Sequence, residues 1–151
     1  MPLEITLGQA SQAGRRERNE DYCGAATPEG AELAAKGVLL ALADGVSGAC
    51  GGREAAESTV RGVLADYYAT PDTWEIPHAL DKVLAAINRW LLAQAASHRE
   101  LAGMSCTLSA LVLRGNRYTL AHVGDTRIYR LRGEQLQQLT TDHVWDRPDM
   151  Q

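Results

Sequence analysis

The stretch VLLALADGVSGACGGRE at residues 38–54 decides the fold of this chain. Its first six residues, 38–43, form an unbroken apolar run, which is typical of a strand buried on both faces. The run ends at Asp44, and the glycines that follow let the backbone turn and leave the Gly45 carbonyl unshielded. We therefore expect Asp44 at the open end of a rigid strand, which is a common way to present a metal-binding carboxylate.

The segments around this stretch predict an α+β fold. Apolar residues recur at helical spacing over residues 52–68 and again from about 77 to 98, which predicts two amphipathic helices. Short strands are expected at 5–10 and 22–26, and after residue 103 a period of two with glycine-containing turns predicts an antiparallel meander. Because strands and helices come in blocks, we expect one domain with helices on one sheet and a second sheet stacked against it.

Bulk composition excludes several classes of function. Hydrophobic residues make up 45% and charged residues 23%, which is ordinary for a globular protein, and the net charge of −4 gives no support for nucleic-acid binding. No apolar run approaches the roughly 20 residues needed to span a bilayer, and no signal peptide is evident. The three cysteines have no framework spacing, which favours free thiols in a reducing compartment. We expect a cytoplasmic protein without a membrane or nucleic-acid partner.

Carboxylates at predicted strand ends and turns are the first candidates for chemistry. They are Glu20, Asp21, Asp44 and Asp125. Hard divalent cations such as Mg²⁺ and Mn²⁺ prefer such oxygen ligands. An aspartate beside a glycine is also ordinary turn chemistry, and that interpretation is favoured for each residue taken singly. Taken together, with one of them directly after a buried strand, they make a metal site a competitive hypothesis.

Arginines lie beside the first of these acids. Arg15, Arg16 and Arg18 carry the planar fork that suits phosphate, although a solvated charged turn is the alternative and the sequence does not choose among the three. The glycine-rich turn has neither the lysine of a phosphate-binding P-loop nor a G-x-G-x-x-G pattern. No cysteine is followed six residues later by an arginine, so the thiols are expected to pack rather than to act as nucleophiles.

Four segments, in chain order, resemble motifs of the metal-dependent protein serine/threonine phosphatases of the PP2C (PPM) family. They are RERNED at 16–21, ADGVSG at 43–48, HVGDTRIY at 122–129 and LTTDH at 139–143. The resemblance implies an αββα four-layer sandwich, present only in part. The family's later D-G and D-N motifs lie beyond the end of this sequence, so residues 1–151 are expected to be the N-terminal portion of a single phosphatase domain.

The resemblance also implies a two-metal centre of Mg²⁺ or Mn²⁺. Asp44 would bridge the two ions, and the Gly45 carbonyl would bind one of them. Glu20 and Asp21 would reach metal-bound water. Asp125 matches the position linked to a further, weaker metal.

The implied activity is hydrolysis of phosphoserine or phosphothreonine in a phosphoprotein by metal-activated water. Arg16 would hold the substrate phosphate. Val46 occupies the position where some members have a histidine proposed as general acid, so that role has no candidate. Without the later ligands, this chain alone is expected to be weak or inactive and to self-associate through uncovered sheet surfaces. The alternative is a non-catalytic, phosphatase-like regulatory binding module.

Overall fold

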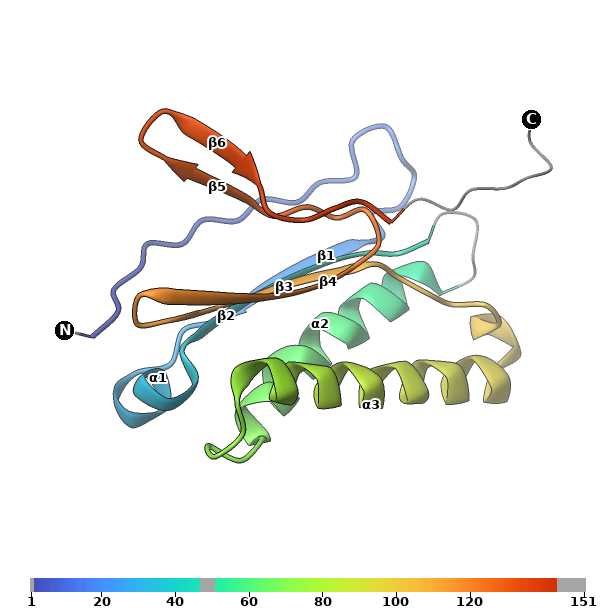
Figure 1. Cartoon of the computed structure of the whole chain (residues 1–151). Helices are drawn as coiled ribbons and strands as arrows, with labels where there is room; N and C mark the ends of the chain where they lie inside the picture. Colours follow the sequence, from blue (N-terminus) through green and yellow to red (C-terminus); the bar gives the residue numbers. More distant parts are fainter. Residues whose placement is uncertain (1, 47–50, 144–151) are drawn as a thin grey trace.

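A four-stranded antiparallel sheet forms the centre of this computed structural model, which describes residues 2–46 and 51–143 (Figure 1). The spatial order of the strands is β1-β2-β3-β4. Their bounds are Asp21–Ala26 for β1, Val38–Asp44 for β2, Leu108–Arg114 for β3 and Arg117–Val123 for β4. The turn predicted at residues 47–50, including Cys50, lies outside the described residues.

Two long helices cover one face of this sheet (Figure 1). They are α2, Gly52–Ala69, and α3, Ile76–Ser97, and both predictions of amphipathic helices are confirmed. Pro77 lies in the first turn of α3, where its missing N–H costs nothing. A 3₁₀ turn, η1 (Arg99–Leu101), follows α3. Within the described residues, no helix is long and apolar enough to cross a membrane.

A short helix, α1 (Gly30–Lys36), lies between β1 and β2, where the sequence analysis assigned no helix. Its seven residues, GAELAAK, are too few to show a helical period, although most are good helix formers. The side chain of Lys36 is buried, and its Nζ donates to Pro71 O at 3.4 Å just beyond the end of α2. Tyr67 Oη in turn donates to Lys36 O at 2.7 Å. These contacts tie α1 to α2.

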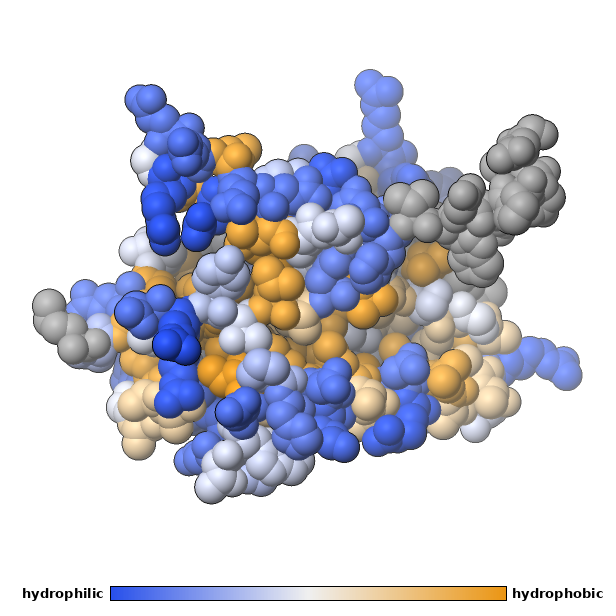
Figure 2. Space-filling view, viewed as in Figure 1, coloured by the Kyte–Doolittle hydropathy of each residue, from blue (hydrophilic) through white to orange (hydrophobic). Residues whose placement is uncertain are grey.

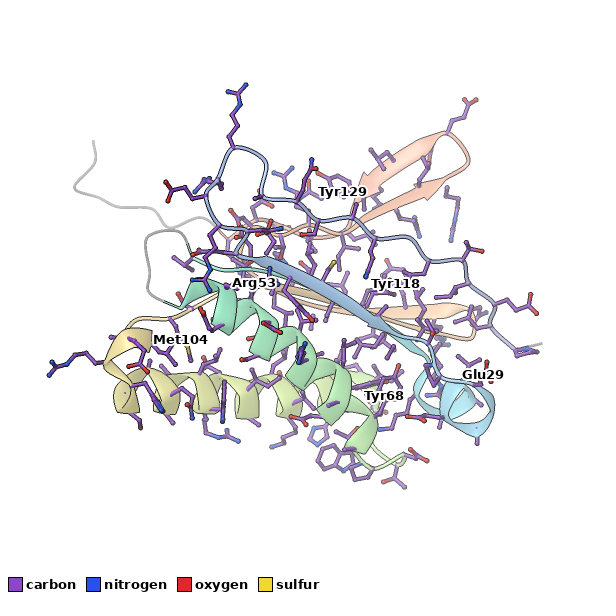
Figure 3. All side chains as sticks on the ribbon, turned by 180° about the vertical axis from the view of Figure 1, so that it is seen from behind. Glu29, Arg53, Tyr68, Met104, Tyr118 and Tyr129 are labelled. Carbon is purple, nitrogen blue, oxygen red and sulfur yellow. The ribbon has the colours of Figure 1, made fainter. Side chains whose placement is uncertain are left out.

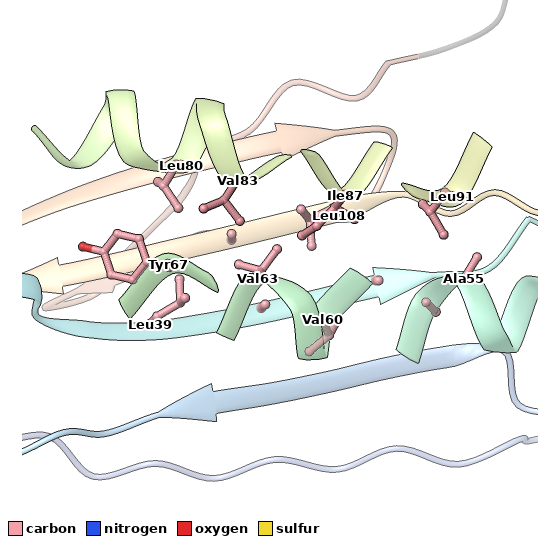
Figure 4. Packing of buried hydrophobic residues seen from close by; sticks show 14 of the residues in the cluster. Leu39, Ala55, Val60, Val63, Tyr67, Leu80, Val83, Ile87, Leu91 and Leu108 are labelled. Atoms are coloured by element: carbon pink, nitrogen blue, oxygen red, sulfur yellow. The ribbon is translucent and has the colours of Figure 1, made fainter. Parts of the chain in front are cut away.

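The hydrophobic core lies between α2, α3 and the sheet (Figure 4). Leu39 of β2 and Val60, Val63 and Tyr67 of α2 are fully buried. Burial of each such aliphatic side chain contributes about 1.5–3 kcal/mol. The buried face of α2 therefore packs against alternate residues of β2. This packing holds the strand that carries Asp44 in a fixed position.

The opposite face of the sheet is only partly covered, so the prediction that β2 is buried on both faces is wrong for the described residues. Leu42 is 39% exposed, whereas its neighbours Ala41 and Ala43 are buried. A separate hairpin of β5 (Tyr129–Arg132) and β6 (Gln135–Gln138) lies on this side (Figure 1). This hairpin has two strands and cannot cover a four-stranded sheet.

The strand predicted at residues 5–10 does not form. These residues run along the open side of the sheet as an irregular segment with no ladder partner among the described residues (Figure 1). Leu7 and Leu42 line a cavity of about 310 Å³ together with Ile128, which precedes β5. Leu7 therefore lies against the apolar open side of the sheet, although its segment does not join the sheet.

Candidate active site

Antiparallel pairing of β1 with β2 brings three of the predicted acidic residues together, namely Glu20, Asp21 and Asp44. Asp21 at the start of β1 pairs with Asp44 at the end of β2. One residue beyond the pair, Gly45 N donates to Glu20 O at 3.0 Å. The backbone of Asp44 is also held by the residue before β3, because Thr107 N donates to Asp44 O at 2.9 Å. Asp44 is thus fixed by strands on both sides.

Close backbone packing at this point depends on two glycines. A Cβ on Gly45 would lie 2.4 Å from Gly52 O, and a Cβ on Gly52 would lie 2.7 Å from Glu20 Oε2. The absence of side chains therefore lets the end of β2, the start of α2 and the Glu20 carboxylate share one small volume.

Two pockets meet at Asp44 and Gly45. The first, here called the Arg16 pocket, has a volume of about 460 Å³ and is also lined by Arg16, Glu20 and Asp21. The second, here called the Asp125 pocket, has a volume of about 340 Å³ and is lined by Asp44, Gly45, Val46, Thr107, Gly124, Asp125 and His143. All the residues predicted for the site therefore line one or both of these adjoining pockets.

The acidic groups interact strongly at Asp44. Burial of its carboxyl, then a hydrogen bond with the Asp21 side chain, and then the negative charges of Asp21, Asp125 and Glu20 raise the pKa of Asp44 from 3.8 to about 6. Like charges held this close favour a bound proton or a bound cation. A divalent cation would relieve the same repulsion more completely.

The donor chemistry fits Mg²⁺ or Mn²⁺, since carboxylates and a backbone carbonyl are hard oxygen ligands. Across residues 2–46 and 51–143, however, no group of three or more His, Cys, Asp or Glu side chains is arranged so that it could hold a metal ion. The acids surround Asp44 without converging on one point. The individual ligand assignments to Asp44, Gly45, Glu20, Asp21 and Asp125 remain predictions.

Comparison with known proteins identifies the family. The family model described as protein phosphatase 2C matches residues 9–146. This chain belongs to the protein phosphatase 2C family. The resemblance noted in the sequence motifs is confirmed, and the sheet with two helices on one face is part of the protein phosphatase 2C fold.

Named relatives are bacterial serine/threonine phosphatases. The chain is 37% identical over 148 residues to PstP of Mycobacterium tuberculosis, covering 95% of this chain and 26% of that protein. It is 33% identical to the phosphatase stp of Listeria innocua, covering 85% of this chain and 50% of that protein. A crystal structure of the PstP catalytic domain with two manganese ions matches with a TM-score of 0.70 and 35% identity, over 88% of this chain and 54% of that one. The chain spans about half or less of the length of these relatives.

Several residues of this protein phosphatase 2C site had no role assigned from the sequence. Asn19 Oδ1 accepts a hydrogen bond from Asp21 N at 3.0 Å, and Thr107 Oγ1 accepts one from Asp44 N at 3.2 Å. His143 Nδ1 accepts one from Gly124 N at 3.1 Å. Asn19 and His143 belong to the motifs quoted above. Their place in these motifs is the sequence feature that could have identified them as residues of the site.

The prediction that the thiols pack rather than react is consistent with the structure at Cys106. Cys106 is half-buried, its Sγ lies 3.3 Å from Thr59 Oγ1, and burial raises the pKa of its thiol, so it is poorly suited to act as a nucleophile. His122 of β4 has its Nδ1 2.9 Å from Ser109 Oγ and its Nε2 3.1 Å from Thr141 O.

Proposed function

We propose that this chain is the N-terminal portion of a metal-dependent protein serine/threonine phosphatase domain that acts on phosphoserine and phosphothreonine in phosphoproteins. The observation that carries the proposal is the gathering of Glu20, Asp21 and Asp125 around Asp44, beside a pocket lined by Arg16, in a chain of this family. The names of the relatives support the reaction and the class of substrate.

The acidic residues would hold two Mg²⁺ or Mn²⁺ ions, with Asp44 between them and the Gly45 carbonyl on one. When bound, such ions neutralise charge on a phosphoryl group and activate water. The two manganese ions in the PstP structure support this number of ions. Within this chain, Glu20 and Asp21 would orient water at the same end of the sheet, and Asp125 would serve a weaker neighbouring cation.

Arg16 would bind the substrate phosphate. It lines the same pocket as Glu20 and Asp21, so a phosphoryl group entering there would meet a guanidinium as well as carboxylates. The planar guanidinium matches two oxygens of a phosphate.

The test compares this chain with a protein extended by the rest of its domain, using a phosphothreonine peptide and Mn²⁺. We expect hydrolysis by the extended protein and little by this chain alone. Equal activity in both would overturn the proposal that the active domain needs residues beyond 151. In the extended protein, Asp44→Asn should lower kcat/KM by about a hundredfold or more, because it removes the bridging charge. Asp81→Asn on α3 is the matched control, and retained activity in Asp44→Asn would rule out its role.

A non-catalytic binding module is the second candidate. It is favoured by the absence, among the described residues, of a cluster of three or more side chains arranged for a metal. Calorimetry separates the two candidates. Failure of the extended protein to bind Mn²⁺ would favour the binding module, whereas Mn²⁺ binding lost in Asp44→Asn would favour the phosphatase.

We also propose that this chain self-associates when alone and that it resides in the cytoplasm. Exposed apolar side chains on the open side of the sheet support the first proposal. The free thiols of Cys23 and Cys106 support a reducing compartment.

A further inference from the structure

Arg53, in the first turn of α2, is bonded to the backbone on both sides of Glu20. Its Nη1 donates to Asn19 O and to Asp21 O, each at 3.1 Å. The carbonyl between them, Glu20 O, accepts from Gly45 N at 3.0 Å. Consecutive carbonyl oxygens at 19, 20 and 21 are therefore held alternately by α2 and by the end of β2. Figure 3 labels Arg53 where α2 begins beside β1.

The location of this cation is unfavourable by local rules. The N-terminus of a helix carries partial positive charge, so an arginine in the first turn is disfavoured there relative to an acid. Arg53 nevertheless lies there, with its guanidinium carbon 5.2 Å from the centre of the Tyr22 ring. The hydrogen bonds to the 19–21 backbone and the contact with Tyr22 offset the unfavourable interaction of the guanidinium with the helix dipole. They explain why an arginine occupies this position, which helix formation alone does not.

We propose that Arg53 is a positioning residue of the metal centre. By fixing the backbone of Asn19–Asp21 against α2, it sets where the Glu20 and Asp21 carboxylates meet Asp44. The inference rests on the proposed function and deepens it, because Arg53 acts through these carboxylates. Outer residues that orient metal ligands commonly influence metal affinity by 10–100-fold.

Arg61 provides a matched control on the same helix. Its guanidinium carbon lies 6.0 Å from the centre of the same Tyr22 ring, and its Nε donates to Tyr22 Oη at 3.3 Å. Its contacts within the described part of the chain are with Tyr22 and Glu57. Arg61→Ala therefore removes one positive charge, both contacts with Tyr22 and the ion pair with Glu57, and it leaves the carbonyls at 19 and 21 bonded.

The first measurement is amide hydrogen exchange in this 151-residue chain, without metal. Arg53→Ala should speed exchange at residues 20–22 by about tenfold or more relative to wild type, because this backbone loses its attachment to α2. Arg61→Ala should change it by less than about twofold. Arg53→Lys keeps a donor at this position and should lie between the two. Equal exchange in Arg53→Ala and Arg61→Ala would overturn the proposal.

The second measurement is Mn²⁺ affinity by calorimetry, in this chain and in the extended protein. We expect Arg53→Ala to weaken binding by about tenfold, with partial recovery in Arg53→Lys and no change in Arg61→Ala. Equal affinity in Arg53→Ala and wild type would overturn the positioning role even if exchange increases. If the wild-type sequence binds no Mn²⁺ in either protein, the proposed metal centre is wrong, and the inference about Arg53 is wrong with it. This result differs from weaker binding in Arg53→Ala alone. If Arg53→Ala does not fold, Arg53→Lys decides, since wild-type values in both measurements would contradict the proposal.

Discussion

Asp44 is the residue at which the charges of the site meet. Its pKa of about 6 in the folded chain compares with 3.8 for an unperturbed aspartate. The folded state therefore binds more protons than the unfolded state between these two values. This contribution to stability is fully present below pH 3.8 and is lost as the pH rises through 6. At neutral pH, the ionised carboxylates repel one another in the metal-free chain.

Asp44→Asn should therefore stabilise the metal-free chain at pH 7.5 and have little effect at pH 3.5. The gain at pH 7.5 is expected to be about 1 kcal/mol, because solvent screens a partly exposed carboxyl and reduces the effect of the full shift. Urea unfolding in EDTA at the two pH values measures it. Asp81→Asn should show no such pH dependence. A gain of the same size at both pH values would contradict ionisation of the buried Asp44 carboxyl, beside its acidic neighbours, as the cause.

At the scale of elements, the start of α2 is adapted to its neighbour rather than to helix stability. Gly52, the first residue of α2, is buried, and a Cβ there would meet the far end of the Glu20 side chain. Alanine is the better helix former by about 1 kcal/mol in a helix interior. The glycine therefore keeps room for a carboxylate at the expense of helix propensity.

Gly52→Ala should leave the melting temperature nearly unchanged while weakening Mn²⁺ binding by about tenfold. The small gain in helix propensity is offset by displacement of Glu20, which can rotate away because it is long and flexible. Calorimetry and thermal unfolding of this chain and of the extended protein test the two parts. Ser58→Ala, also on α2, is the control for helix propensity. Undiminished Mn²⁺ affinity in Gly52→Ala would show that Glu20 does not contribute at its observed position.

In the molecule as a whole, α2 and α3 cover one face of the four-stranded sheet, whereas the opposite face is only partly covered. Leu131 and Leu136 face each other across β5 and β6 and are 69% and 66% exposed. Figure 2 shows hydrophobic side chains on the surface over this hairpin and over the sheet beneath it. Apolar surface of this kind associates in water.

This chain should therefore form dimers or larger species at about 100 µM, and replacing both Leu131 and Leu136 with serine should shift it toward monomer. Sedimentation velocity measures both. Leu92→Ser on α3 removes a leucine that is 63% exposed on the helical side, so it should leave the distribution unchanged. A monodisperse wild-type monomer would contradict the proposal of self-association.

The elements that follow from a local sequence pattern could be predicted without the structure. Short windows of sequence contain the helical periods of α2 and α3 and the alternation of β3 and β4. They also contain the abrupt end of an apolar run at Asp44. Local periodicity specifies an element and its buried face, because the helix and the strand each repeat at a fixed interval. The quoted motifs indicated the family. The family in turn indicated which residues lie around Asp44, without any information on their contacts.

Which surfaces meet depends on contacts between segments that are distant in the sequence. The exposed face of Leu42, the unpaired segment at 5–10 and the bonds of Arg53 to residues more than 30 positions away depend on contacts that no local pattern encodes. A side chain can be apolar without being covered, and an arginine in a helix gives no sign of the carbonyls it will bind. Packing between distant segments sets both outcomes, because it brings β1, β2 and α2 together at the end of the strand that carries Asp44.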